Sequence, residues 1–238
     1  LLTIRANILA GRSLSIFAAM QLDISRFHPD AAARSRADKL VSLLIPVQKA
    51  YCTDRGFDAC VMAQQVLGGH GYVAEWGLEQ NMRDARIAQI YEGANGVQAL
   101  DLMGRKTVRA NGELLALLSE EMDAFVASQA GVPAMQSYLV SLATCRRVLS
   151  DATLFVIDSA ASNPEEIGAA SYAYMELMGL TLYCFMWQRI LAAALADKGG
   201  DNAEYLDGLV KVGEFFLARQ VPRVHSLLAE IEAGSESL

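Results

Sequence analysis

The residues best suited to chemistry lie in the segment 64–106. Glu92 stands between Tyr91 and Gly93, directly after an apolar run and at a predicted helix break. A carboxylate placed beside apolar groups is partly desolvated, which raises its pKa and suits it to act as a general base near neutral pH. The alternative is an exposed glutamate at a helix end, and the neighbouring residues alone do not decide between the two.

A glycine cluster is the second unusual feature of this segment. It consists of Gly68, Gly69, His70 and Gly71, and it predicts a loop. One or two glycines suffice to end a helix and form a tight turn, but the same glycines would also let the backbone approach a ligand closely. The spacing is not GxGxxG and no strand precedes it, which excludes a Rossmann fold. His70 is either an acid–base group or an ordinary turn histidine.

Other patterns that could do chemistry have simpler interpretations. Arg83, Asp84 and Arg86 are interpreted as a surface or interhelix ion-pair cluster. The sequence shows no metal-ligand spacing, no nucleophile elbow and no Ser-His-Asp arrangement. The cysteines have no CxxC spacing, and we interpret them as buried free thiols of a reducing cytoplasm. These cysteines are Cys52, Cys60, Cys145 and Cys184.

Composition and charge narrow the function classes. The chain has 238 residues, of which 53% are hydrophobic and 20% charged, so it is long and apolar enough for a globular core. A formal net charge of −7 argues against nucleic acid as a partner. The stretch Leu177–Gln188 is uncharged over twelve residues, which is short of the ~20 that a membrane span needs. We therefore expect a buried core helix there and no membrane partner.

Almost every long segment shows the 3.6-residue period of helices, and no run alternates as a strand does. We therefore predict an all-α fold, a bundle of long helices. Asp30 and Asn163 are predicted N-caps, and Pro46 is predicted to kink the helix that contains it. The predicted helices cover residues 1–27, 31–67, 78–88, 96–106, 113–129, 134–162, 164–198 and 202–231, with a turn at 199–201. A boundary near Thr107–Gly112 would divide the chain into two helical units, 1–106 and 107–238.

Two motifs in the first unit resemble a known family. QVLGGHGY (Gln65–Tyr72) and MRDARIAQIYEGANG (Met82–Gly96) are similar, in sequence and in spacing, to the C-terminal helical domain of the acyl-CoA dehydrogenases. The resemblance covers residues 1–106, without the opening helix of that domain. Residues 107–238 resemble, more loosely, an additional C-terminal helical region of a bacterial branch that includes the 3-methylmercaptopropionyl-CoA dehydrogenases. The resemblance thus implies a helical domain followed by a second, bundle-like helical extension.

The resemblance also implies a reaction. Family members oxidise an acyl-CoA thioester to the trans-2-enoyl-CoA, with FAD as cofactor. Glu92 occupies the position of the family's base, which removes the α-proton while the β-hydrogen leaves as hydride to the flavin. The backbone N–H of Glu92 would polarise the thioester carbonyl together with a flavin ribityl hydroxyl. Tyr91 and Gly93 would line the acyl slot.

The family's FAD contacts fall on two short segments of this sequence. Ala94 replaces the family's usual threonine, which removes one possible hydrogen bond to flavin, worth about 1 kcal/mol. The cofactor contacts implied by the resemblance are Gln65, Val66, Leu67, Gly68, Gly69, Ala94, Asn95 and Gly96.

Partners follow from the same resemblance. It implies an acyl-CoA substrate, an electron-transfer flavoprotein as acceptor, a role in fatty acid metabolism in the cytoplasm, and a homodimer or tetramer that shares its flavin between subunits. An acyl-CoA oxidase would carry the same motifs. The family's N-terminal helical domain and central β-domain have no counterpart here, and the chain opens on Leu1 without Met. We therefore expect a fragment that alone neither binds FAD tightly nor turns over. The alternative is a non-catalytic helical oligomerisation or interaction module derived from that fold.

Overall fold

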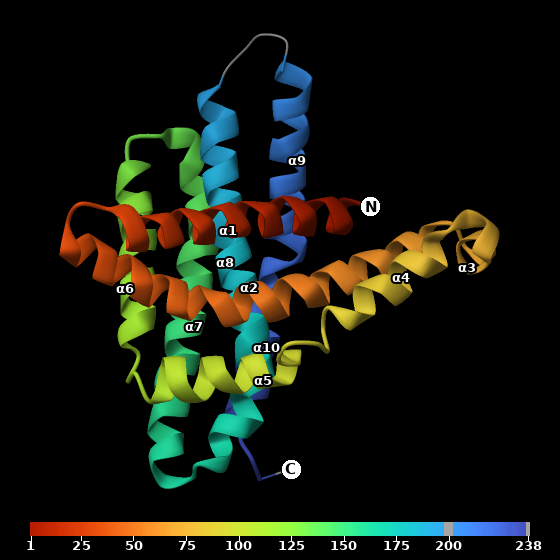
Figure 1. Cartoon of the computed structure of the whole chain (residues 1–238). Helices are drawn as coiled ribbons and strands as arrows, with labels where there is room; N and C mark the ends of the chain where they lie inside the picture. Colours follow the sequence, from red (N-terminus) through yellow and green to blue (C-terminus); the bar gives the residue numbers. More distant parts are fainter. Residues whose placement is uncertain (198–201, 237–238) are drawn as a thin grey trace.

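The structure, a computed structural model, describes residues 1–197 and 202–236, which form a helical bundle with a projecting arm (Figure 1). The described residues contain no strand, so the predicted all-α fold is confirmed. The elements are α1 (Leu2–Phe27), α2 (Ala31–Val66), α3 (Gly69–Tyr72), η1 (Ala74–Trp76), α4 (Leu78–Ile87), α5 (Asn95–Leu100), η2 (Asp101–Val108), α6 (Glu113–Ser128), η3 (Pro133–Met135), α7 (Gln136–Ser162), α8 (Glu165–Ala196), α9 (Ala203–Arg219), η4 (Val221–Arg223) and α10 (Val224–Glu232).

The first two helices form where their end signals predict. The α1 helix ends at Phe27, before the His-Pro pair. The side chain of Asp30 accepts hydrogen bonds from the N–H groups of Ala32 and Ala33, at 3.0 and 3.3 Å, so the predicted N-cap is confirmed. The α2 helix then continues through Pro46 to Val66. Its first half lies in the bundle, and its second half forms the arm together with α3 and α4 (Figure 1).

The α8 helix forms the centre of the core. It packs against α1, α2, α5 and η2 of the first helical unit and against α7, α9 and α10 of the second. Its aromatic side chains include the fully buried Tyr174, Tyr183 and Trp187. By length and composition alone α8 could cross a membrane, but 78% of its most apolar window is buried inside this fold. The stretch Leu177–Gln188 is thus part of a buried core helix, as predicted.

The core is continuous across the predicted boundary between the two helical units. A single cluster of buried side chains includes Leu14 and Leu44 from the first unit together with Leu149 and Leu182 from the second. The backbone turns sharply at the boundary itself, because Asn111 and Gly112 both have positive φ. The two units therefore share one core, while their division into two domains stays a prediction.

Several predicted boundaries differ from the observed ones. The helix predicted over 202–231 is divided into α9 and α10 by η4, because Pro222 has no N–H to continue the helical ladder. The helix predicted over 96–106 is α5 followed by the π-helical η2, and the glycine cluster forms one helical turn, α3, instead of a loop. The N-cap of α8 is Pro164, one residue after the predicted Asn163, although Oδ1 of Asn163 still accepts from the N–H of Glu165 at 3.1 Å. Lys198 and the predicted turn at 199–201 lie outside the described residues.

The contact between α2 and α8 gives a test of this packing. A Cβ at Gly179 would lie 2.2 Å from Cγ of the buried Tyr51 ring, whereas a Cβ at Gly168, on the same helix, would meet no atom within 4 Å. We expect Gly179→Ala to lower the free energy of unfolding by about 3 kcal/mol, because the ring cannot move away in a filled core. Gly168→Ala should leave it unchanged or raise it by about 0.5–1 kcal/mol. Urea unfolding followed by circular dichroism measures both, and equal effects would contradict the packing.

Candidate active site

The predicted base lies in the segment that returns from the arm to the bundle. This segment, residues 89–95, links α4 to α5 and is called the Glu92 loop from here on. Glu92 has φ +49° and Gly93 has φ +88°. A Cβ at Gly93 would be strained at that φ, and it would also lie 2.7 Å from Nε2 of Gln98. The backbone therefore makes a sharp turn with left-handed φ values at Glu92, the predicted base.

One buried carboxylate holds both ends of the Glu92 loop. Asp54, on α2, is 4% exposed. Its Oδ1 accepts hydrogen bonds from Nε2 of Gln89, at 2.5 Å, and from Nδ2 of Asn95, at 2.7 Å. The loop is also closed on itself, because the N–H of Asn95 donates to the carbonyl of Gln89 at 3.0 Å. The loop therefore begins and ends on the same anchor, with Glu92 between the two attachment points.

Asn95 is a structural residue of this site. Asn95 is 5% exposed. Its Nδ2 donates to the carbonyl of Ala50 and to Asp54, and its Oδ1 accepts from Nζ of Lys49 at 2.7 Å. An amide with these partners has no group left for a cofactor. The predicted cofactor contact of Asn95 can therefore involve its backbone alone.

A tyrosine from α8 bonds to the same carboxylate. The Oη of Tyr172 donates to Oδ2 of Asp54 at 2.6 Å. Burial raises the pKa of Tyr172, and the neighbouring Asp54 carboxylate raises it further, so the phenol keeps its proton and remains a donor. Asp54 thus receives hydrogen bonds from the Glu92 loop and from α8 at the same time.

Glu92 itself is exposed, and so is Tyr91, at 53%. Of the two alternatives for Glu92, the structure therefore shows the exposed glutamate, and Ile87 and Ile90 are exposed as well. The N–H of Glu92 donates no hydrogen bond to another residue in the described part of the chain. The side chain and the N–H are both available to a group that approaches this face from outside.

The predicted cofactor contacts form two separate surfaces. Gln65, Val66, Leu67, Gly68 and Gly69 lie at the tip of the arm, and all five are exposed. The remaining contacts lie at its base, beside the Glu92 loop, where α5 begins (Figure 1). These are Ala94 and Asn95, together with the exposed Gly96. The chain does not bring the two sets together, so no single ligand-sized site contains them all.

Backbone conformation and packing within the chain require glycine at some positions of the predicted cofactor surfaces and not at others. Gly68 has φ +57°, and a Cβ at Gly71 would overlap the carbonyl oxygen of Gln64 at 2.1 Å. Gly69 and Gly96 have neither constraint, because a Cβ there would meet no atom within 4 Å. Both are exposed, and glycine is otherwise unfavourable in helices such as α3 and α5. Close approach of an external group would account for them.

Two other candidates have structural roles. The ring of His70 contacts that of Trp76 edge-on, with centroids 5.3 Å apart, as expected of a turn histidine. The predicted ion-pair cluster of α4 is wrong: Asp84 accepts from Gln80, Arg86 donates to Gln89, and no ion pair joins Arg83, Asp84 and Arg86 in the described chain. Asp84 is one residue from Arg83 and two from Arg86, and side chains at these spacings do not face each other on a helix. Asp84 and Arg86 instead bond to amides one turn away.

The structure also shows how far the cysteines are buried and whether side chains are grouped to bind a metal ion. Cys145 and Cys184 are buried free thiols, as predicted, whereas Cys52 and Cys60 are half-buried. Within residues 1–197 and 202–236, no group of three or more His, Cys, Asp or Glu side chains is arranged to hold a metal ion.

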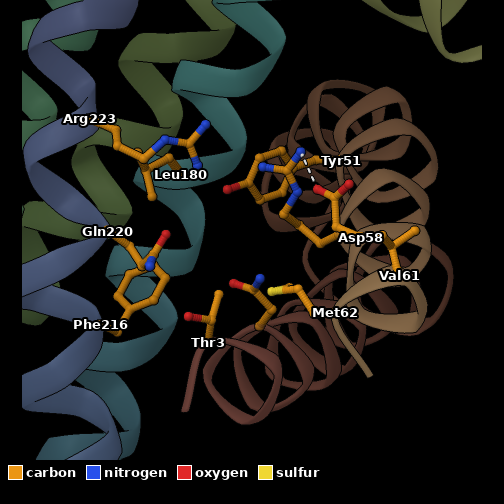
Figure 2. Close-up of a pocket in the computed structure, with 11 residues that line it drawn as sticks. Thr3, Tyr51, Asp58, Val61, Met62, Leu180, Phe216, Gln220 and Arg223 are labelled. Carbon is orange, nitrogen blue, oxygen red and sulfur yellow. Dashed lines mark ion pairs between the residues drawn. The ribbon is translucent and has the colours of Figure 1, made fainter. Parts of the chain in front are cut away.

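Sequence reasoning missed a charged cluster beside a cavity of about 300 Å³. Arg55 donates to Glu176 at 2.9 Å and pairs with Asp58 at 3.1 Å, while Arg223 lies 3.7 Å from Glu176. Figure 2 shows Arg223 and Gln220 on the wall opposite Asp58. Burial raises the pKa of Glu176 although Arg55 and Arg223 act in the opposite direction. The single signal in the sequence is a glutamate within the apolar run of α8.

This cluster joins α2, α8 and η4, and the predicted site residues lie elsewhere. The cavity is lined by Thr3, Asn7, Tyr51, Arg55, Asp58, Val61, Met62, Leu180, Phe216, Gln220 and Arg223. Its cations face carboxylates, so the charges within it are balanced. We interpret the cluster as a polar contact that fixes the second helical unit on the first.

The buried amide of Asn95 gives a test of the loop anchor. Nδ2 of Asn95 lies 2.7 Å from Oδ1 of Asp54. Asn95→Asp would replace this amide nitrogen with a carboxylate oxygen. We expect the free energy of unfolding to fall by about 3 kcal/mol at pH 7, because two buried like charges would face each other. The new carboxyl would have a folded pKa above its unfolded value, so the loss should shrink as the pH falls toward 5.

The matched control for this variant is Asn81→Asp, at an exposed position of α4. It should change stability little at either pH, and urea unfolding at pH 7 and pH 5 measures both variants. If both substitutions changed the free energy of unfolding by similar amounts at both pH values, the proposed role of Asn95 in the loop anchor would be contradicted.

Comparison with known proteins identifies both halves of the chain. Residues 3–106 match the family model for the acyl-CoA dehydrogenase C-terminal domain, and residues 118–238 match the model described as acetyl-CoA dehydrogenase C-terminal like. The second match alone covers half of the chain, and the Glu92 loop and both predicted cofactor surfaces lie within the first.

Three curated relatives are similar over most of this chain. The 3-methylmercaptopropionyl-CoA dehydrogenase of Ruegeria pomeroyi is 33% identical over 93% of the chain. The broad-specificity linear acyl-CoA dehydrogenase FadE5 of Mycobacterium tuberculosis is 30% identical over 82% of it, and a butyryl-CoA dehydrogenase of Syntrophomonas wolfei is 26% identical over 90%. The chain spans 38%, 34% and 36% of the lengths of these relatives, respectively.

Proposed function

Because the chain belongs to the acyl-CoA dehydrogenase family, we propose that it carries the catalytic base and part of the FAD- and substrate-binding surface of an acyl-CoA dehydrogenase. The observation that carries this proposal is the Glu92 loop. Hydrogen bonds to a buried anchor hold its ends, and its exposed turn carries a carboxylate and a backbone N–H that donates to no described residue. Those are the two groups that abstraction of a proton next to a carbonyl requires.

Two exposed glycines support FAD as the cofactor. Gly69 at the tip of the arm and Gly96 at its base leave open the space that a Cβ would fill, and nothing inside the chain requires glycine there. Because these surfaces are separate, we propose that each contacts a different flavin in an assembly of several copies. Ala94 offers no hydroxyl to the cofactor, so its contact would be through the backbone or methyl group.

The proposed reaction uses Glu92 twice. Its carboxylate takes the proton from the α-carbon of the acyl-CoA, which breaks the C–H bond and leaves the electron pair to form the new double bond. Its N–H donates to the thioester carbonyl oxygen, where negative charge develops. FAD, when bound, supplies the acceptor for the hydride that leaves the β-carbon. Tyr91 and Gly93 flank the carboxylate, and we propose that they line the path of the acyl chain.

The apolar surface around Glu92 supports an assembly. Five large apolar side chains within fifteen residues of the base are about half exposed, which is unusual for a surface that water covers. They are Ile87 at 57%, Ile90 at 49%, Tyr91 at 53%, Val97 at 56% and Leu100 at 49%. We propose that further protein of the enzyme, in a homodimer or tetramer, covers this face. Covering it would exclude water from Glu92 and give the base its apolar environment.

The identity of the partners is proposed from the relatives. Their names describe 3-methylmercaptopropionyl-CoA, linear acyl-CoA and butyryl-CoA as substrates. We therefore propose a linear, short acyl-CoA for this enzyme, and an electron-transfer flavoprotein in the cytoplasm as the acceptor of its electrons.

An anaerobic absorbance experiment on the FAD-loaded enzyme tests this function. Addition of butyryl-CoA should bleach the visible flavin band, because hydride transfer reduces the flavin. The variant Glu92→Gln should retain the flavin band. Its rate of bleaching should fall by a factor of at least about 10³, since an amide cannot accept the α-proton. Glu75→Gln, at an exposed acidic position on the arm, is the matched control and should bleach like the parent enzyme.

Two results would overturn the proposal. Bleaching by Glu92→Gln at the parent rate would remove Glu92 as the base. A complete enzyme, containing this chain, that remains colourless after expression with excess flavin and forms a defined oligomer would support the non-catalytic interaction module instead.

A further inference from the structure

The Glu92 loop has few contacts of its own apart from its two ends. Ile90, Tyr91 and Glu92 are exposed. Gln89 at the first end and Asn95 at the second both donate to the carboxylate of Asp54, and Asn95 is held by Ala50 and Lys49 as well. Asp54 is thus the side chain that both ends share, and a shift of its carboxylate would move them together. A group that holds Asp54 acts on Glu92 through it.

Tyr172 is such a group, and it comes from the other helical unit. It lies on α8, within the stretch 118–238, whereas Asp54 and the Glu92 loop lie within the stretch 3–106. Its Oη donates to Oδ2 of Asp54 at 2.6 Å, which leaves Oδ1 for the two loop amides. A hydrogen bond to a charged acceptor is among the stronger ones in proteins. The carboxylate is thus fixed from both sides, by α8 and by the loop.

The half-exposed position of Tyr172 makes its role separable from core packing. Tyr172 is 48% exposed, whereas its neighbour Tyr174 is fully buried in the same helix. The ring of Tyr172 therefore contributes less to the core, while its hydroxyl reaches a residue that is 4% exposed. Loss of the hydroxyl alone would remove the protein donor to Oδ2 of Asp54, and the carboxylate could then shift.

We propose that Tyr172 is a positioning residue for the base Glu92, acting through Asp54, and that the second helical unit thereby sets the geometry of the catalytic loop. This inference rests on the proposed function, since it assumes that Glu92 is the base. Its structural part, the dependence of the Glu92 loop on Tyr172, can be measured without any reaction.

The first measurement is amide hydrogen exchange in the full chain. Tyr172→Phe keeps the ring and removes the hydroxyl, and Tyr205→Phe, at a 54% exposed position of α9 with no side-chain hydrogen bond to a described residue, is the control. Exchange in residues 88–96 should be about tenfold faster in Tyr172→Phe, because the loop anchor is weakened. It should be unchanged in Tyr205→Phe, and unchanged in α10 in both variants.

The second measurement is turnover by the FAD-loaded enzyme. In Tyr172→Phe we expect kcat to fall about tenfold at unchanged KM, because binding is retained and the base is misplaced. The isotope effect with an α-deuterated acyl-CoA should increase, since proton removal becomes more rate-limiting. A merely stabilising role of Tyr172 would lower the melting temperature and leave the isotope effect as it is.

The outcomes separate this inference from the proposed function. Unchanged exchange in residues 88–96 of Tyr172→Phe overturns the inference, whatever the reaction is. Faster exchange with unchanged kcat and isotope effect also overturns it, because the loop would then move without consequence for the base. If Glu92→Gln were fully active, the proposed function would fail, while faster exchange would still show that Tyr172 holds the loop.

Discussion

The site depends on one buried carboxylate, that of Asp54. An ionised carboxylate with 4% exposure is costly unless hydrogen bonds replace the water it has lost. Gln89, Asn95 and Tyr172 supply those bonds, so the requirement of Asp54 for hydrogen-bond donors holds two segments in place, the Glu92 loop and α8. The strained turn at Glu92 persists because both of its ends are held in this way.

The central helix α8 connects this site to the rest of the fold. Its apolar side chains fill the core that the two helical units share, and two of its polar side chains reach α2. Glu176 binds Arg55, and one turn earlier Tyr172 binds Asp54. The extension that resembles an additional domain is therefore packed against α2 and α5, the two helices beside the Glu92 loop. This arrangement gives the extension a physical connection to the residue that we propose as the base.

Much of the fold could be predicted from local signals, and the site only in part. The cap at Asp30 and the apolar stretch in α8 depend on neighbouring residues, so the sequence shows them directly. The break at Pro222 is also a local signal, because proline has no N–H for the helical ladder. Glu92 is indicated by a family motif, but the sequence leaves its exposure open and does not show its anchor. Asp54, Gln89 and Tyr172 are distant in the sequence, and only packing shows that they meet.

The central claim is that Asp54 couples the Glu92 loop to α8, and a double-mutant cycle tests it most directly. Tyr172 and Asn95 both bond to Asp54, through different oxygens. We expect the effects of Tyr172→Phe and Asn95→Ala on the free energy of unfolding to be non-additive by at least about 0.5 kcal/mol. Effects that add to within about 0.3 kcal/mol would show two independent contacts and would contradict the account.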